Sequence, residues 1–384
     1  MTEYWKAVEA VTGYPIADLP DFTVDTLPAT LSRPETFTGT MPISEADSAS
    51  PVNWLQACDP WSVAILRIDD VTNQVVGGGY VNGRVRTQGD TATVPLVTAE
   101  GYFDRRMTGA YAPVATDQNT IMSQLVTQFV ITASAAGLNG WPGTVNVIGG
   151  AGTARDRTYQ VADRKTVLTN LTELNRVIGG PEFTVTWQHL SGPERWLPVF
   201  NVGTVIGTSP MPGLAPAVSF ELGGTIQGGT VVDFAYTEDY STGKGANYVT
   251  AYAITDPTTG LQVSQSLPYT GNARQLEIDY AWNPSTTITD AATLLAHVQQ
   301  KLPLMQTGAR SLALSIQGNV FPQFGVDFNL GDVVTYRIGG LDQNLQETVP
   351  SVPGGISGNA RVIGVIRQQP DSPNPITTPI LGSV

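Results

Sequence analysis

Two histidines and one cysteine are the side chains of this sequence best suited to hold a metal or to act as a base or nucleophile. His189 follows the alternating segment 183–187, and His297 stands beside Val298 in an apolar stripe. Neither histidine belongs to a His-Glu-x-x-His pattern, and a structural zinc site needs four ligands of the Cys and His type. We therefore expect both histidines to be structural and no metal site to be present.

Cys58 is the single cysteine, so an intramolecular disulfide is impossible. It follows Trp54-Leu-Gln-Ala, close to apolar residues. A buried, unreactive thiol is the favoured interpretation over a reactive one.

Three pairs of neighbouring carboxylates could supply the acid and base of a glycosidase: Asp69/Asp70, Glu238/Asp239 and Glu277/Asp279. The first two pairs are expected in turns, where acidic side chains accept local hydrogen bonds. The third pair shares one face of an expected strand, as at a solvated edge. A glycosidase needs a fixed carboxyl separation, and the sequence does not supply it.

Two glycine-rich segments resemble nucleotide-binding loops only in part. The segment 149–155 follows an expected strand at 145–148, but it lacks a third glycine at the right spacing and a following helix. The segment 241–245 lacks the leading glycine and the Ser or Thr after the lysine that a phosphate loop requires. No Gly-x-Ser-x-Gly elbow is present, although a Ser-His-Asp triad set by geometry stays open. We expect no catalytic residue and no cofactor.

Composition and charge narrow the class of protein further. The chain has 384 residues with a formal net charge of −13, and its 20 Lys and Arg are thinly spread, which disfavours nucleic-acid binding. No apolar run approaches the ~18 residues of a membrane span, and the first residues lack the pattern of a secretion signal. The seven Trp are scattered, which favours packing over a sugar-binding platform. Abundant Gly and Pro favour strands joined by tight turns.

Hydrophobic periodicity predicts the elements that would position these residues. Residues 1–20 predict a short helix that ends before Pro15. Strands are expected at 36–42, 62–69, 75–81 and 90–98, and their spacing suggests a small barrel or sandwich. Later strands are expected at 183–187, 218–222, 230–237, 248–254, 276–280, 311–316, 333–338 and 361–366. The segment from Gln369 is Pro-rich and is expected to be extended or disordered.

Three helices are predicted from apolar spacing and capping residues. Thr116 or Asp117 caps the first, which Gly137 ends. Asp163 caps the second, which ends at 179–181. The third starts after Thr289. Their apolar stripes are Ile121, Met122, Leu125, Val126 and Phe129; Val167, Leu168, Leu171, Leu174 and Ile178; and Ala291, Leu294, Leu295, Val298 and Leu302.

Several short segments between residues 35 and 368 resemble those of a known protein family and occur in the same order. They are Phe37-Thr-Gly-Thr-Met-Pro-Ile43, Val63-Ala-Ile-Leu-Arg-Ile68, Gly79-Tyr-Val-Asn-Gly83, Thr116-Asp-Gln-Asn-Thr-Ile121, the helix from Asp163 to Leu174, Phe183-Thr-Val-Thr-Trp187, Val218-Ser-Phe-Glu-Leu-Gly223, Phe328-Asn-Leu-Gly-Asp-Val-Val334 and Arg361-Val-Ile-Gly-Val-Ile366. In this order the chain resembles the minor tail proteins of long-tailed actinobacteriophages, which are relatives of the tail-tip hub.

The resemblance implies an α+β, predominantly β fold with two small β-barrel hub domains and inserted α/β domains. The expected divisions are 1–115 for an N-terminal segment and the first barrel, and 116–215 for an α/β domain. A β-rich hub segment at 216–288, a helix with second-barrel strands at 289–368 and a Pro-rich tail at 369–384 follow. The family carries over no catalytic, cofactor or metal residue. Because the chain ends at Val384, soon after the second barrel, no hydrolase or fibre extension is expected.

The resemblance also implies a homotrimer whose six barrels form a ring at the virion's tail tip, assembled in the host cytoplasm. The ring would sit below the distal tail protein and meet the tape-measure protein and the tip fibres or spike. DNA would pass through its lumen without specific binding, and an acidic lining would prevent sticking. Two alternatives stay open: a tail protein that binds host cell-wall carbohydrate, and a cell-wall hydrolase.

Overall fold

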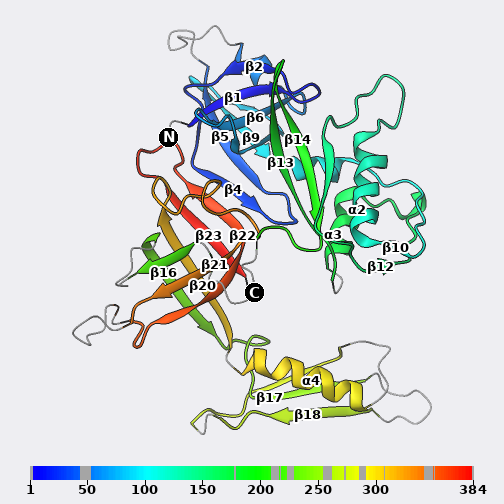
Figure 1. Ribbon diagram of the computed structural model, residues 1–384, viewed down its shortest axis with the longest axis vertical. Coiled ribbons are helices and arrows are strands. Elements are labelled where there is room, and N and C mark those ends of the chain that lie inside the picture. Colours follow the sequence, from blue (N-terminus) through cyan, green and yellow to red (C-terminus); the bar gives the residue numbers. More distant parts are fainter. Residues whose placement is uncertain are drawn as a thin grey trace. The chain divides into compact units, whose positions relative to one another are not determined.

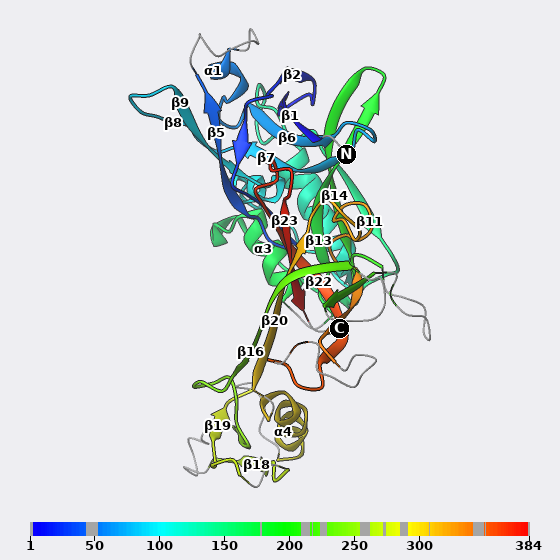
Figure 2. The same cartoon turned by 90° about the vertical axis from the view of Figure 1, so that its left-hand side faces the viewer.

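A computed structural model of the chain describes residues 3–43, 53–176, 179–208, 216, 218–222, 229–253, 262–271, 274–284, 291–306, 308–340, 349 and 351–382. The chain forms two compact units, Met1–Asp233 with Leu314–Val384, and Phe234–Ala313. It passes from the first unit to the second along strand β16 (Gly229–Asp239) and returns along β20 (Ala309–Gln317), as Figure 2 shows. The predicted predominantly β fold is confirmed. The predicted divisions near residues 115, 215, 288 and 368 stay predictions.

The first sheet is built from the N-terminal hundred residues, in the order β2-β1-β6-β7-β9-β5-β3, with β8 paired to β9. Its strands are β1 (Glu3–Glu9), β2 (Pro15–Asp18), β3 (Thr23–Val24), β5 (Thr36–Pro42), β6 (Val63–Asp69), β7 (Val75–Val81), β8 (Val85–Arg86) and β9 (Thr91–Val97), with a one-turn helix α1 (Trp54–Ala57) before β6. The helix predicted within residues 1–20 is wrong. Every residue of β1 pairs with β6, from Glu3 opposite Asp69 to Glu9 opposite Val63, so tertiary pairing decides the conformation of this segment.

The first sheet is buried on both faces at β6, which explains why this strand is a nearly continuous apolar run. Val63 and Ile65 belong to one core cluster, whereas Ala64, Leu66 and Ile68 belong to another. Strand alternation therefore sends successive side chains of β6 into two different cores.

Glycines in β7 allow its neighbours to approach closely. Gly78 has φ +130°, and a Cβ at Gly79 would lie 2.1 Å from the Val97 carbonyl oxygen of β9. A Cβ at Gly77 would lie 2.4 Å from a methyl carbon of Leu27, which belongs to the second sheet. Only glycine at these three positions leaves room for the neighbouring strands and for Leu27 to pack against β7.

An α/β block packs on one face of the first sheet. Figure 1 shows β13 and β14 between that sheet and helices α2 and α3. The elements are η1 (Ala99–Arg105), β10 (Thr116–Asp117), α2 (Gln118–Val126) with the π turn η2 (Thr127–Ile131), β11 (Thr144–Ile148), β12 (Ala154–Arg155), η3 (Val161–Asp163), α3 (Val167–Asn175), β13 (Glu182–Ser191) and β14 (Glu194–Gly203). Strand β14 pairs antiparallel with β13 and parallel with β11.

The observed start of α2 agrees with the prediction, whereas its end and the start of α3 differ from the predicted positions. Asp117 caps α2 as predicted, accepting the Thr120 N–H at 2.9 Å. Asp163 does not cap α3: the left-handed Arg164 (φ 51°) turns the chain, and Thr166 caps instead by accepting the Thr169 N–H. The first helix ends at Ile131, before Gly137, where Thr132 turns extended and Arg106 donates to the carbonyl oxygens of Phe129 and Thr132. Ile178, predicted in the stripe of the second helix, lies outside the described residues.

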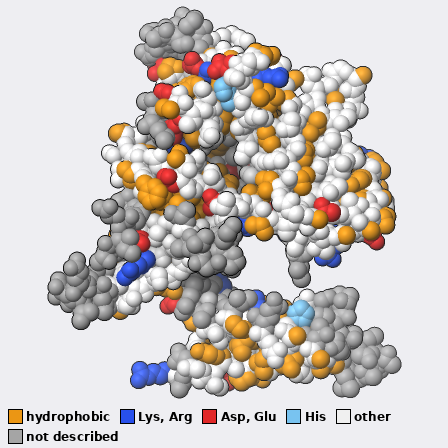
Figure 3. Space-filling view, in the orientation of Figure 1, with side chains coloured by type: hydrophobic (Ala, Val, Ile, Leu, Met, Phe, Trp, Pro, Cys, Tyr) orange, Lys and Arg blue, Asp and Glu red, His pale blue; other side chains and the backbone are white. Residues whose placement is uncertain are grey.

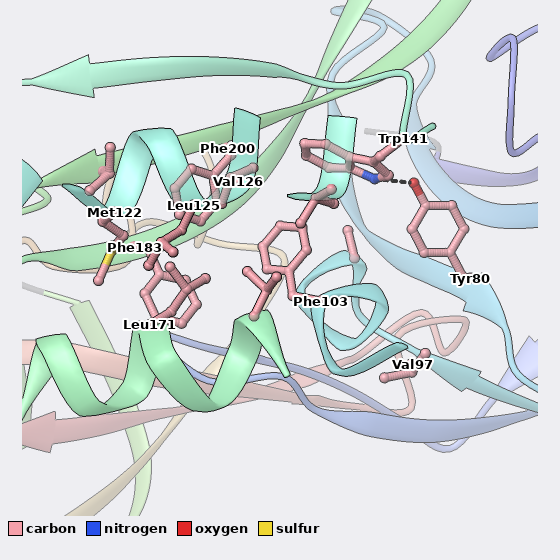
Figure 4. Packing of buried hydrophobic residues seen from close by; sticks show 14 of the residues in the cluster. Tyr80, Val97, Phe103, Met122, Leu125, Val126, Trp141, Leu171, Phe183 and Phe200 are labelled. Carbon is pink, nitrogen blue, oxygen red and sulfur yellow. Dashed lines mark hydrogen bonds between the residues drawn. The ribbon is translucent and has the colours of Figure 1, made fainter. Parts of the chain in front are cut away.

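The largest core joins the first sheet to this block (Figure 4). Phe103 meets Trp141 and Phe200 edge to face, with ring centroids 5.4 Å apart in both pairs. The Trp141 indole donates to the Tyr80 hydroxyl at 2.8 Å, so these two buried polar groups are partners within the core. The predicted stripes of α2 and α3 supply Met122, Leu125, Val126 and Leu171 to the same core.

The second sheet combines one N-terminal strand with strands from the last two-fifths of the chain. Its strands are β4 (Thr26–Thr30), β15 (Ser219–Leu222), β16, β20, β21 (Val333–Ile338), β22 (Ile356–Gln368) and β23 (Ile376–Gly382). Pairing runs β21-β15-β16-β20-β23-β22, and β22 also pairs with β21, so the path returns to its start; β4 adds to β22. The segment after Gln369, expected to be extended or disordered, contains β23, which pairs antiparallel with β22.

The second unit is a helix on a small sheet. Strands β17 (Tyr248–Tyr252), β18 (Ser264–Pro268) and β19 (Asp279–Trp282) pair in the order β18-β17-β19. Helix α4 (Ala291–Met305) packs Leu294 and Val298 against Val249 and Ala251. The predicted stripe is correct at these two positions and at Leu302, which packs against the same core, whereas Ala291 is exposed. The strand predicted at 276–280 begins three residues later than expected.

Glu100 is a buried carboxyl where η1 meets β13, and it generates a pH prediction. It accepts the Val185 N–H at 2.8 Å, and burial raises its pKa above the ordinary 4.5. A raised pKa means that its contribution to the unfolding free energy is fully present below about pH 4.5 and is lost as pH rises through the folded-state pKa. We expect Glu100→Gln to gain stability relative to the natural chain as pH rises from 4.5 to 8, measured by urea unfolding.

Asp69 offers a control of opposite sign. Burial raises its pKa, but hydrogen bonds from Thr72 and Val71 outweigh burial and hold the pKa below its ordinary value. The Asp69 carboxylate should therefore stabilise the natural chain near neutral pH, and this stabilisation should be lost as pH falls. The stability difference between the natural chain and Asp69→Asn should shrink accordingly. Parallel pH profiles for Glu100→Gln and the natural chain would contradict the prediction.

Candidate functional site

Arg361 of β22 joins the α/β block to the second sheet. Its guanidinium forms a two-pronged ion pair with Glu182 of β13, the Nη2–Oε2 distance being 2.5 Å. It also donates from Nε to the Gly331 carbonyl oxygen at 2.9 Å and from Nη2 to the Ile206 carbonyl oxygen at 2.5 Å. Glu182 in turn accepts the Ile206 N–H at 2.9 Å. Both side chains are largely buried, so each needs the other to offset its lost hydration.

Two glycines let the backbones meet beside Arg361. Gly331 (φ +88°) and Gly207 (φ +92°) lie against each other, and a Cβ at Gly331 would fall 2.0 Å from the Ile206 carbonyl oxygen. Any side chain here would separate the two segments that Arg361 bridges. Glycine is therefore required by both conformation and space.

Asp332 completes this junction on its exposed side. Its Oδ1 accepts the Thr208 N–H at 2.6 Å and the Thr208 hydroxyl at 2.8 Å, and its Oδ2 accepts the Asn329 N–H at 2.8 Å. The chain leaving the α/β block is thus held where it reaches β21. Glu182, Ile206, Gly207, Thr208, Gly331, Asp332 and Arg361 form what we call the Arg361 junction.

A second buried cluster joins the first and second sheets. Arg67 of β6 forms ion pairs with Glu3 and Asp371 and donates to the Pro370 carbonyl oxygen at 2.5 Å. The Trp5 indole donates to Asp371 at 3.0 Å, and the Arg67 guanidinium lies 5.2 Å from the centre of the Trp5 ring. Strands near the two ends of the chain are thereby held together.

Arg367 of β22 adds a second cation to this cluster. Its Nη2 donates to both Glu3 oxygens, at 2.8 and 2.9 Å. The side chains of Arg67 and Arg367 are only 5% and 7% exposed, so Glu3 compensates two guanidinium groups in a region with little water. Glu3, Trp5, Arg67, Arg367 and Asp371 form what we call the Arg67 cluster.

The two histidines lie in different units, each in its own local surroundings. His189 is on β13, where its ring packs 5.0 Å from Trp196 and its Nε2 lies 4.0 Å from a Glu194 oxygen. His297 is half-buried on α4 of the other unit. Among the described residues, no group of three or more His, Cys, Asp or Glu side chains could hold a metal.

The carboxylate pairs serve local turns or face solvent. Asp69 ends β6 and accepts three hydrogen bonds from Val71 and Thr72. Asp239 ends β16 and pairs with Lys244 at 2.6 Å, and the Lys244 and Ser241 hydrogen bonds hold its pKa far below the ordinary value. The expectation that Glu277 and Asp279 share a strand face is wrong, because β19 begins at Asp279; both residues are exposed.

Neither glycine-rich segment has the structure of a phosphate loop. The segment after β11 leads into strand β12, and the N-terminus of α2 is already engaged by Asp117 and by the Thr153 carbonyl oxygen, which accepts the Gln118 N–H. In the segment 241–245, the Lys244 ammonium is paired with Asp239.

Cys58 and the tryptophans pack inside the protein. Cys58 is fully buried, and burial raises the pKa of its thiol to about 11, so the thiol form dominates at neutral pH. Trp5, Trp141 and Trp196 are buried and the other four are half-buried, which fits the expected packing role.

Only weak sequence signals point to the residues of the Arg361 junction and the Arg67 cluster. Gly331, Asp332 and Arg361 lie within segments that carry the family resemblance, but each segment alone resembles an ordinary turn entering a strand. Arg67 also lies in such a segment, 63–68, whereas Glu3 and Arg367 carried no signal beyond being charged residues within apolar strands. A charged residue in a run such as Val63–Asp69 is the one clue that a buried partner exists.

Comparison with known proteins identifies the class of fold as that of phage tail proteins. The 43 kDa tail protein of prophage MuSo2 from Shewanella oneidensis matches with a TM-score of 0.56 at 12% identity, covering 99% of this chain and 98% of that one. The tail protein from Neisseria meningitidis MC58 matches with a TM-score of 0.56 at 10% identity, covering 100% and 97%. No family model and no curated protein matches the sequence. In the described part of the chain, no helix is long and apolar enough to cross a membrane.

The Arg361 junction generates a stability prediction. Arg361→Met leaves Glu182 buried without its cation, and such a loss costs about 3–5 kcal/mol of unfolding free energy. The control Arg33→Met breaks the exposed Arg33–Glu35 pair and should cost at most ~1 kcal/mol. Urea unfolding at pH 7 measures both, and the double change Arg361→Met with Glu182→Met should recover part of the loss. Equal effects of Arg361→Met and Arg33→Met would contradict a buried junction.

Proposed function

We propose that this chain is a non-enzymatic structural protein of a long-tailed phage, a homotrimeric hub at the tail tip. It would connect the tail tube, through the distal tail protein, to the tip fibres or spike, and it would contact the tape-measure protein. The observation that carries the proposal is the end-to-end match of its fold to phage tail proteins of nearly the same length. The ordered sequence segments that resemble actinobacteriophage tail proteins support the same role.

The pairing of the second sheet supports a barrel-type hub domain. Six of its strands form a closed circuit of neighbours, which leaves no free edge within that circuit. The first sheet surrounds its own core cluster, although its pairing path is open. We infer that these two sheets are the two hub barrels and that the Phe234–Ala313 unit is an insertion between β16 and β20.

The edge strand β11 suggests where copies of the chain meet. No described strand pairs with its outer edge, and Thr144–Ile148 contains neither a charge nor a proline. Free edges of monomeric proteins are usually protected by such residues. Val147 is 49% exposed on this strand. We infer that β11 contacts a neighbouring copy in the trimer.

The surface chemistry suits passage of DNA without binding. The face in Figure 3 shows few charged side chains, spread among hydrophobic and uncharged polar ones. The net charge is −13, and tight nucleic-acid binding requires clustered cations to neutralise phosphates.

The oligomeric state tests the hub. We expect size-exclusion chromatography with light scattering to give three times the 40.8 kDa chain mass. Val147→Asp should shift the mass toward the monomer because it places a charge on the β11 edge. The matched control Val71→Asp, in an exposed turn, should leave the trimer intact.

Because some hubs trimerise only during assembly, the same variants should also be cross-linked within purified virions. A natural chain that is monomeric in both settings would contradict the hub. A monomer that binds cell-wall sugar would support the carbohydrate-binding alternative, and measurable turnover of cell-wall polymer would support the hydrolase.

The lining of the channel is a separate expectation. In a reconstruction of the tail tip with this chain labelled, Asp and Glu should outnumber Lys and Arg on the inner wall, because like charge repels the passing phosphates. A neutral or basic wall would contradict it.

A further inference from the structure

A small polar cavity lies in the α/β block between α3 and the segment that precedes it. Its volume is about 90 Å³, several times the ~10–15 Å³ that a single water requires. Its lining includes Arg157, Tyr159, Asp163, Lys165, Asn170 and Glu173. The cavity lies apart from both arginine junctions, and the tail role gives it no task.

Two buried polar atoms of the lining have no partner: the Arg157 Nε and the Tyr159 hydroxyl. Tyr159 is only 8% exposed, and its ring stacks on Tyr111 with centroids 6.0 Å apart. Burial raises the pKa of Tyr159 to about 12, so its hydroxyl keeps its proton at neutral pH and can donate. Leaving buried donors unpaired is costly, which indicates that something outside this chain satisfies them.

The cavity lining holds two cations, and only Lys165 forms an ion pair among the described residues. Lys165 pairs with both Glu173 oxygens, at 2.6 and 2.9 Å, and Asp163 accepts the Gln160 N–H at 3.2 Å. Asn170 donates to the Thr108 hydroxyl at 2.8 Å. No described residue forms an ion pair or hydrogen bond with the Arg157 guanidinium. Arg157 is half-buried, so water reaches part of its side chain, whereas an oxyanion would satisfy the guanidinium and the tyrosine hydroxyl together.

We propose that this cavity binds a small oxyanion, phosphate or carboxylate, through Arg157 and Tyr159. Arginine has only donors, in a planar array that matches the oxygens of either group. The tyrosine hydroxyl supplies a further donor, and Lys165 has a third N–H beyond the two that face Glu173. The nearby carboxylates of Asp163 and Glu173 keep the affinity modest and make it sensitive to salt.

The test is calorimetric titration of the full chain with inorganic phosphate and, separately, with acetate, with sodium chloride holding the ionic strength constant. We expect saturable binding of at least one anion. Preference for phosphate or for acetate then distinguishes the two sources of the oxyanion. Arg157→Gln should weaken binding at least tenfold, and Tyr159→Phe should weaken it severalfold.

Arg164→Gln is the matched control, because it removes the same charge from an exposed position seven residues away and outside the cavity lining. It should bind as the natural chain does. If Arg157→Gln fails to fold, Tyr159→Phe and Arg157→Lys carry the test. No saturable binding, or equal losses in Arg157→Gln and Arg164→Gln, would overturn the site. Because none of these measurements depends on trimer formation, their failure would leave the proposed hub untouched.

Discussion

The buried arginines of β22 are the constraint on which the first unit depends. A guanidinium removed from water is tolerated only where carboxylates and carbonyl oxygens meet it in the right geometry. Arg361 finds them in Glu182, Ile206 and Gly331, and Arg367 finds them in Glu3. The single strand β22 thus links the α/β block, the N-terminal strand and the second sheet. A shift in its register would leave the buried Arg361 and Arg367 without their partners.

This arrangement agrees with the structural role proposed above. Residue types that often serve in catalysis have structural roles here. His189 packs on Trp196, Asp69 accepts the hydrogen bonds of a turn, and Cys58 is buried with a raised pKa. Ion pairs between segments as distant as Glu3 and Arg367 hold the chain's ends together. In the cavity beside α3, the buried Arg157 Nε and Tyr159 hydroxyl have no partner among the described residues.

Local sequence patterns predict the positions of many helices and strands but are less reliable for where these elements begin and end. Strand β6 and the apolar stripes of α2 and α3 were predictable because alternation and helical spacing reflect burial directly. The N-terminal segment was mistaken for a helix because its strand conformation comes from pairing with β6, some sixty residues later. The predicted cap of α3 lies three residues before the observed one because Arg164 adopts a left-handed conformation, which is uncommon for arginine and cannot be predicted from its residue type.

What the sequence alone determined was the predominantly β character, the positions of most strands and the lack of any complete catalytic motif, since these follow from composition and short-range spacing. The tertiary structure alone decided which strands become neighbours and which charges are buried together. Arg361 and Glu182 are 179 residues apart, and Arg67 and Asp371 are 304 apart. No local pattern encodes such pairs, because the partner of a buried charge is chosen by the path of the whole chain.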